Sequence, residues 1–146
     1  MDDRLHAPFA PRRARRVALG FALAVAAAAG GIAVLAPASY RTGDRIGFLV
    51  IGALIVWFLT RQAGVRAVPT DQGLLVRNLL LSRRLEWPQV VSVRFGDRPW
   101  VQLDLDDGDT LAVMAIQRSD GARAVQESRR LATLVEMHTA APPAQT

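Results

Sequence analysis

The chain has 146 residues, of which 51% are hydrophobic, and its formal net charge is +5. It contains no cysteine, which excludes disulfide frameworks, thiolate metal sites and cysteine nucleophiles. Residues 1–61 carry all of the net charge, because ten arginines and ten acidic residues balance one another in the remainder. Nucleic acid is therefore not an expected partner, since the C-terminal part has no excess of positive charge with which to bind it.

The first predicted element is a membrane-spanning helix over residues 17–36, which follows a basic cytoplasmic tail, residues 1–16. The 20 residues of this segment carry no charge. At 1.5 Å per residue they are long enough to cross a hydrocarbon core of ~30 Å. The segment is rich in Ala and Gly, and such small residues allow a second helix to approach closely.

The second predicted span, residues 46–60, is more hydrophobic per residue but shorter. Arg45 and Arg61 bracket it, and Trp57 lies near one end, as interfacial residues do. Helical extension into residues 42–44 would supply part of the missing length. Pro37 to Asp44 forms a short polar turn, so residues 17–61 are expected to be a transmembrane hairpin.

The arginine distribution predicts the orientation of the hairpin. Five arginines precede the first span, two lie in the turn, and Arg61 and Arg66 follow the second span. The expected protein is a multi-pass protein of the plasma membrane with both termini in the cytoplasm. The alternative is a secretory signal cleaved at Ala36-Pro37-Ala38, which would put the C-terminal part on the other side of the membrane.

Residues 62–138 predict a small, mainly β domain of antiparallel strands followed by a C-terminal helix. Alternating apolar residues and turn signals mark the strands, and Asp107-Gly108 is a strong hairpin-turn dipeptide. The six candidate strands are Ala63 to Pro69, Leu74 to Asn78, Ser82 to Trp87, Val90 to Phe95, Trp100 to Leu105 and Thr110 to Ile116.

The helix is expected from about Gly121 to His138, with Ser119 or Asp120 as its N-cap. Six residues at helical spacing would form one apolar stripe that packs on the sheet. They are Ala124, Val125, Ser128, Leu131, Ala132 and Val135. Residues 139–146 are expected to be a disordered tail.

Several of these segments together resemble a known family. They are Thr70 to Asn78, Ser82 to Trp87, Val93 to Phe95, Trp100 and Asp107-Gly108. The pattern resembles the bacterial PH domain of the low molecular weight protein antigen 6 type, found in small actinobacterial membrane proteins. The resemblance implies a PH-like fold of two near-orthogonal antiparallel sheets with a C-terminal helix. A full PH barrel has seven strands, one more than the candidates here.

Catalytic groups are scarce in this sequence. His6 lies near the N-terminus and His138 at the end of the helix, and no serine has a base or an elbow motif nearby. The acidic cluster of Asp104, Asp106, Asp107 and Asp109 is best explained as a solvated hairpin turn, because it lacks the distal Glu of a calcium loop. No catalytic, cofactor or metal site is expected.

The candidate binding residues are arginines and tryptophans of the predicted sheet. Arg77, Arg83, Arg84 and Arg94 could form a basic patch that faces anionic headgroups, or could lie on solvated strand faces. Trp87 and Trp100 could pack the sheet or serve as a ligand platform.

The expected function is a membrane-anchored, non-enzymatic PH-like binding or scaffolding module at the cytoplasmic face. Its expected partners are the lipid bilayer and either a protein that remains to be identified or a second copy of the chain. Two alternatives remain open, a sensor of anionic lipid surfaces and an accessory subunit of a membrane enzyme or transporter.

Overall fold

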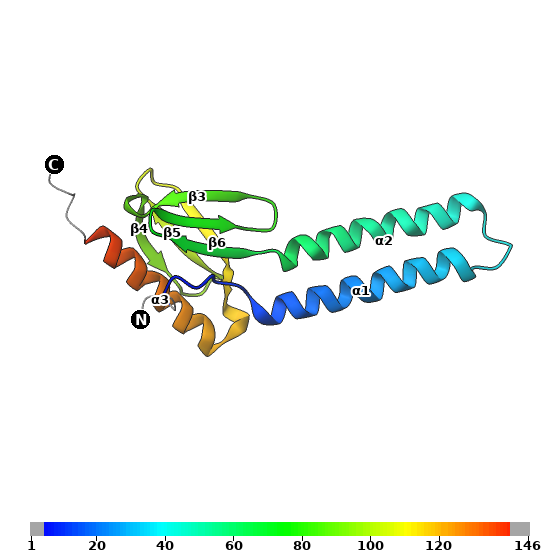
Figure 1. Cartoon of the computed structure of the whole chain (residues 1–146), viewed down its shortest axis with the longest axis horizontal. Coiled ribbons are helices and arrows are strands. Elements are labelled where there is room, and N and C mark those ends of the chain that lie inside the picture. Colours follow the sequence, from blue (N-terminus) through cyan, green and yellow to red (C-terminus); the bar gives the residue numbers. More distant parts are fainter. Residues whose placement is uncertain (1–4, 141–146) are drawn as a thin grey trace. The chain divides into compact units, whose positions relative to one another are not determined.

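The computed structural model describes residues 5–140. They form two compact units, a helical hairpin over residues 12–64 and a β-domain made of residues 5–11 together with residues 65–140. In the hairpin, α1 (Arg12–Leu35) and α2 (Thr42–Ala63) lie side by side and run antiparallel (Figure 1). Both helices are long and apolar enough to cross a membrane.

The second helix is longer than the apolar run that predicted it. It begins at Thr42, so it has 22 residues and a length of about 33 Å, which matches the hydrocarbon core. Small residues bring the helices together, because a Cβ atom added to Gly52 would lie 2.6 Å from the Cβ of Ala29. Arg45 closes the turn by donating hydrogen bonds to the carbonyls of Ala33 (3.1 Å) and Ala36 (2.8 Å) at the end of α1.

The β-domain contains two three-stranded antiparallel sheets, here called sheet A and sheet B (Figure 1). This confirms the predicted PH-like class and the presence of the six predicted strands, although the first begins at Arg66 and not at Ala63, because α2 continues through Ala63. Sheet A has the order β1 (Arg66–Thr70), β2 (Gly73–Arg77), β3 (Ser82–Glu86), and sheet B has the order β4 (Val90–Arg94), β5 (Trp100–Leu105), β6 (Thr110–Gln117). The 3₁₀ turn η1 (Trp87–Gln89) joins the two sheets, and η2 (Arg118–Asp120) leads into α3 (Ala122–Thr139).

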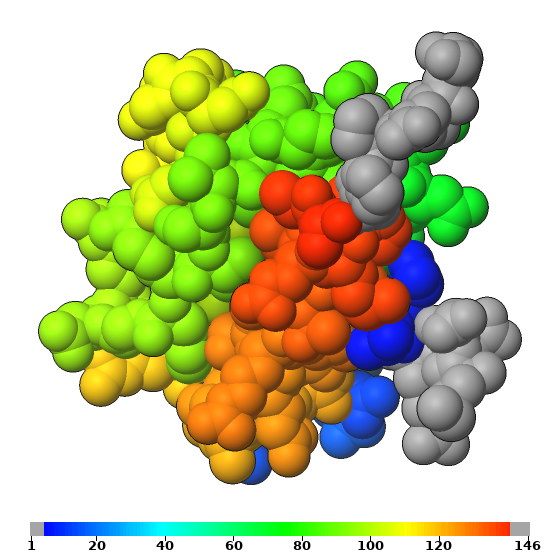
Figure 2. Space-filling view, turned by 90° about the vertical axis from the view of Figure 1, so that its left-hand side faces the viewer, coloured from blue at the N-terminus to red at the C-terminus, as the bar shows by residue number. Residues whose placement is uncertain are grey.

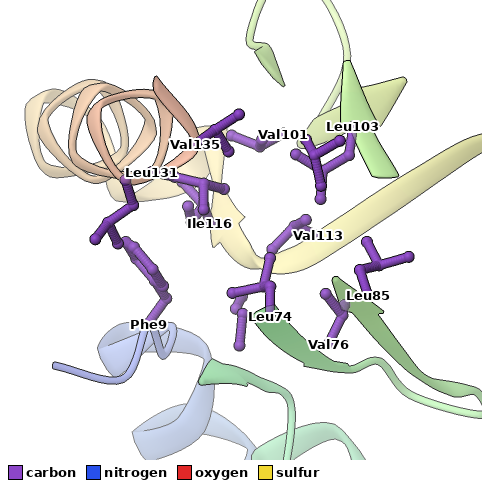
Figure 3. Packing of buried hydrophobic residues seen from close by; sticks show 14 of the residues in the cluster. Phe9, Leu74, Val76, Leu85, Val101, Leu103, Val113, Ile116, Leu131 and Val135 are labelled. Atoms are coloured by element: carbon purple, nitrogen blue, oxygen red, sulfur yellow. The ribbon is translucent and has the colours of Figure 1, made fainter. Parts of the chain in front are cut away.

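The core lies between the two sheets and α3. Alternation along β5 buries Val101, Leu103 and Leu105 and leaves the residues between them partly exposed. Figure 3 shows how side chains from both sheets and α3 converge in this core. The backbones of β2 and β3 approach each other closely at Gly73. A Cβ added there would lie 1.9 Å from the carbonyl oxygen of Leu85, so this position requires glycine.

The start of α3 differs from the prediction. Ser119 and Asp120 belong to η2, so neither caps the helix, and Gly121 occupies the N-cap with a φ of 61° and no side-chain hydrogen bond. The buried stripe is also rotated, because Leu134 is fully buried whereas Val125 is 39% exposed. The helix therefore packs on the sheets through Ala124, Ser128, Leu131, Leu134 and Val135.

The sequence predicts a basic cytoplasmic tail over residues 1–16. In the structure, residues 5–11, which precede α1, pack into the β-domain, and this is the largest difference from the prediction. Phe9 is 1% exposed and forms a bridge with Ala67, in which each backbone N–H donates to the other residue's carbonyl (2.8 and 3.0 Å). Its ring points toward Leu131 of α3 (Figure 3). This contact could not be predicted from the sequence, because a single large aromatic residue among Ala and Pro has no periodicity to detect.

Arg130 of α3 covers the Phe9 ring, with its guanidinium carbon 3.8 Å from the ring centroid. The same guanidinium donates to the carbonyls of Leu5 (3.2 Å) and Ala7 (2.9 Å) and pairs with Glu127 at 2.6 Å. Figure 2 shows the N-terminal segment, in dark blue, beside the orange and red surface of α3. At the other end of the chain, α3 extends through Thr139, and residues 141–146 of the predicted tail lie outside the described residues.

We expect Phe9→Ala to destabilise the β-domain by about 3–5 kcal/mol, because it removes a buried ring and the support beneath Arg130. Chemical denaturation of the detergent-solubilised chain, followed by tryptophan fluorescence, measures this change. The matched control is Val91→Ala, which truncates a side chain that is 66% exposed and should change the stability little. Equal effects of the two substitutions would contradict the assigned role of Phe9.

Candidate functional site

Two of the four predicted patch arginines, Arg83 and Arg94, form ion pairs within the β-domain. Arg83 lies opposite Val76, on the inner face of sheet A. Its guanidinium reaches the β5–β6 turn of sheet B, with distances of 3.2 Å to Asp107 and 3.6 Å to Asp109. Arg94 pairs with Asp104 on the neighbouring strand. These two arginines are therefore partly neutralised, and Arg83 joins the two sheets.

The other two, Arg77 and Arg84, lie on the outer face of sheet A. In the strand register Arg84 is opposite Leu75, and Arg77 is opposite both Arg66 and Ser82. Because side chains two residues apart share a face, Arg66, Arg77 and Arg84 point to the same side. We call these three residues the basic face. Within residues 5–140, none of the three forms a salt bridge.

Arg66 was not among the predicted site residues. The segment that contains it reads as a weak strand, and a residue cannot be assigned to a face until the strand register is known. The register that the structure shows places Arg66 directly opposite Arg77. Antiparallel pairing across the β1–β2 turn makes them direct neighbours.

The two tryptophans have different environments. Trp87 is 2% exposed, donates from Nε1 to the carbonyl of Thr70 (2.9 Å), and stacks on His138 with the ring centroids 4.6 Å apart. Trp100 begins β5 opposite Gln117 and is half-buried. Trp87 is thus a packing residue of the core, and only Trp100 offers part of its ring to solvent.

His6 and His138 come from opposite ends of the chain and meet beside Trp87. Their ring centroids are 5.9 Å apart in an edge-to-face arrangement, and Nδ1 of His138 lies 2.8 Å from the carbonyl oxygen of Leu134. The sequence separated these residues by more than a hundred positions, and only the packing of the N-terminal segment against α3 unites them. Within the described part of the chain, no group of three or more His, Cys, Asp or Glu residues could hold a metal ion.

A hollow opens on the outer face of sheet A at the β1–β2 turn. Its volume is about 800 Å³. The lining is mixed in character, with the half-buried Leu75, the Arg84 cation and the Glu86 carboxylate among polar turn residues. Because β3 is an edge strand of sheet A, the hollow also lies next to a strand edge with which no other strand of residues 5–140 pairs. This hollow and the basic face together make the outer face of sheet A the candidate binding surface.

The pKa of the Asp104 carboxyl lies below its ordinary value. A hydrogen bond from the Ser92 hydroxyl and a second from the Arg94 guanidinium hold the pKa of this carboxyl below 3.8. Thr110 adds a weaker contact at 3.4 Å. Asp104 thus links β4, β5 and β6 on the outer face of sheet B, and this arrangement is structural.

Comparison with known proteins gives one family. The chain matches the family described as "Bacterial PH domain" over residues 64–133. It is 36% identical over 112 residues to uncharacterized protein Rv1417 of Mycobacterium tuberculosis and, equally, to uncharacterized protein Mb1452 of Mycobacterium bovis. In each case the similarity covers 74% of this chain and 73% of the relative. No solved structure matches the chain significantly.

We expect Asp104→Asn to be less stable than the natural protein at neutral pH, with the difference disappearing in acid. Because folding lowers the pKa of Asp104, its stabilising contribution is complete above pH 3.8 and is lost as the pH falls through the folded-state pKa. Denaturation midpoints of both proteins between neutral pH and the acid range test this expectation. Arg94→Gln should weaken the pH dependence without abolishing it, since Ser92 remains. If the natural protein and Asp104→Asn lost stability in parallel as the pH falls, the expectation for Asp104 would be refuted.

Proposed function

Because the chain belongs to the bacterial PH domain family, we propose that it is a membrane-anchored, non-enzymatic binding module. It holds its β-domain at the cytoplasmic face of the plasma membrane and recruits or scaffolds a protein partner there. The observation that carries this proposal is the outer face of sheet A, where an open hollow lies beside Arg84 and the edge of β3.

Anchoring is supported by the surfaces of the two apolar helices. Large apolar side chains project outward along both of them, such as Phe21 (62% exposed), Leu23 (73%), Leu54 (61%) and Trp57 (56%). An exposed apolar surface of this extent is stable in lipid and unfavourable in water. Arg45 fits the same arrangement, because the carbonyls at the end of α1 need a hydrogen-bond donor in the turn.

An intact hairpin is favoured over a cleaved signal by the position of Phe9. Cleavage after Ala38 would remove Phe9 from the core of the β-domain and would expose the side chains that now surround it. The backbone bridge between Phe9 and Ala67 connects the residues just before α1 to those just after α2. A chain that enters and leaves the membrane through one domain has both helix ends on the same side.

A non-enzymatic role is supported by the tasks that the reactive side chains already perform. His138 stacks on Trp87, and the carboxylates of Asp104, Asp107 and Glu127 each pair with an arginine. A general base must lie within hydrogen-bonding distance of the nucleophile or substrate from which it takes a proton. These four side chains are instead held by the contacts just named. The hollow beside Arg84 remains as a recognition surface for a protein partner, and its lining carries the Arg84 cation together with the carboxylates of Asp71 and Glu86.

Reporter fusions test the anchoring part of the proposal. A fusion at the turn near Tyr40 should report the outer side of the membrane, and a fusion at the C-terminus should report the cytoplasm. The cleaved-signal alternative predicts the loss of residues 1–38 from the mature chain and a C-terminus outside the cytoplasm. Mass spectrometry of the membrane-bound protein distinguishes these outcomes.

Site-specific photo-crosslinking tests the binding surface. A photoreactive residue in place of Gln72, which lines the hollow, should give a discrete protein adduct when the full chain is expressed in the membranes of its own host. Arg84→Glu should reduce the adduct, because it replaces the cation that lines the hollow with a carboxylate beside Glu86 and so reverses the charge that a partner meets there. The same photoreactive residue at Val91 of β4 is the control and should give no adduct. Absence of any adduct at position 72 would count against the proposal.

A further inference from the structure

Three consecutive leucines, Leu79 to Leu81, form the loop between β2 and β3. Leu80 is 68% exposed and Leu81 is 75% exposed. Single exposed apolar residues are common on protein surfaces, but these two are adjacent at the tip of a hairpin. The other large apolar residues exposed within the described part of the β-domain, Val91, Val125 and Met137, are separated in sequence.

Asn78 holds this loop firmly at its base. Its backbone N–H donates to the carbonyl of Leu81 (2.9 Å), which closes the turn. Its side chain bonds to sheet B, donating to the carbonyl of Ala112 (2.7 Å) and accepting from the N–H of Met114 (3.1 Å). The leucines are therefore presented to the surroundings by a supported turn.

Two cations of the basic face lie at the same end of sheet A as this loop. Arg77 ends β2, and the strand register puts Arg66 on one side of it and Ser82 on the other. Neither Arg66 nor Arg77 has a salt bridge among the described residues. Apolar side chains bordered by unpaired arginines are the combination that favours the interface of a bilayer containing anionic lipid.

The chain itself keeps this end of sheet A near the membrane. Only Gly64 and Val65 separate the last residue of α2 from Arg66. Three residue steps from Ala63 to Arg66 span at most about 11 Å when fully extended. Arg66 is thus close to the end of a helix that crosses the bilayer in the proposed function, and Arg77 is its direct neighbour in the sheet.

We propose that the β2–β3 loop inserts Leu80 and Leu81 into the anionic surface of the membrane that anchors the chain, with Arg66 and Arg77 contacting the lipid headgroups. This inference rests on the proposed anchoring and adds a second membrane contact, made by the β-domain. It leaves the hollow at the opposite end of sheet A free for a protein partner.

Because the chain has no cysteine, a single introduced cysteine can carry a probe. Leu80→Cys is labelled with nitrobenzoxadiazole and reconstituted as the full chain into vesicles of phosphatidylcholine, with or without phosphatidylglycerol. We expect several-fold brighter, blue-shifted emission with phosphatidylglycerol, and quenching by lipids with a nitroxide on the acyl chain. The matched control is Val91→Cys, also on an exposed apolar residue, which should show neither change. Arg66→Gln combined with Arg77→Gln should lower the signal at position 80.

The other outcomes separate this inference from the anchoring. If the protein resists carbonate extraction but position 80 is as exposed to water as position 91 in both vesicles, the loop insertion is refuted and the anchoring stands. If position 80 is shielded from water and also from the lipid quencher, a protein covers the loop, and the insertion is again refuted. If carbonate extracts the protein, the proposed anchoring fails, and the insertion fails with it.

Discussion

The burial of Phe9 beneath the Arg130 guanidinium connects the two ends of the β-domain. A largely buried arginine is stable only when its charge and its donors are satisfied. Here Glu127 supplies the opposite charge, and the carbonyls of Leu5 and Ala7 accept hydrogen bonds from the guanidinium. These acceptors belong to the segment before the first apolar helix. The residues before α1 are therefore part of the domain that follows α2, and the chain leaves and returns to one core.

The structure separates the arginines into those that bond to other parts of the protein and those that lie on an outer face. Some stabilise the protein internally, as Arg45 does at the end of α1, Arg83 between the sheets and Arg94 beside Asp104. Others, such as Arg66 and Arg84, lie on one face of sheet A and form no salt bridge with any of residues 5–140. A count of charges along the sequence cannot make this distinction, because it depends on which carboxylate lies opposite each guanidinium.

Much of the fold could be predicted from local patterns. The alternation from Trp100 to Leu105 and the Asp107-Gly108 turn defined β5 and its hairpin correctly, because a half-buried strand imposes a period of two on its own sequence. The cap of α3 was predicted wrongly, since Ser119 and Asp120 have the chemistry of a cap but lie in a 3₁₀ turn. The candidate binding residues were chosen for being arginine or tryptophan. Of these, the structure places only Arg77 and Arg84 together on the outer face of sheet A, and the strand register shows that Arg66 lies on the same face.

By itself the sequence determined the two apolar helices, the six strands, the final helix and the resemblance to bacterial PH domains, because each depends on the spacing of residues that are close along the chain. The tertiary structure decided the inclusion of Phe9 in the core, the pairing of Arg83 with the opposite sheet and the position of the exposed leucines beside Arg66 and Arg77. The first two features arise between residues that are distant in sequence, and the third depends on the strand register that places Arg66 opposite Arg77. No periodicity records such contacts, which form only when the sheets and α3 pack together.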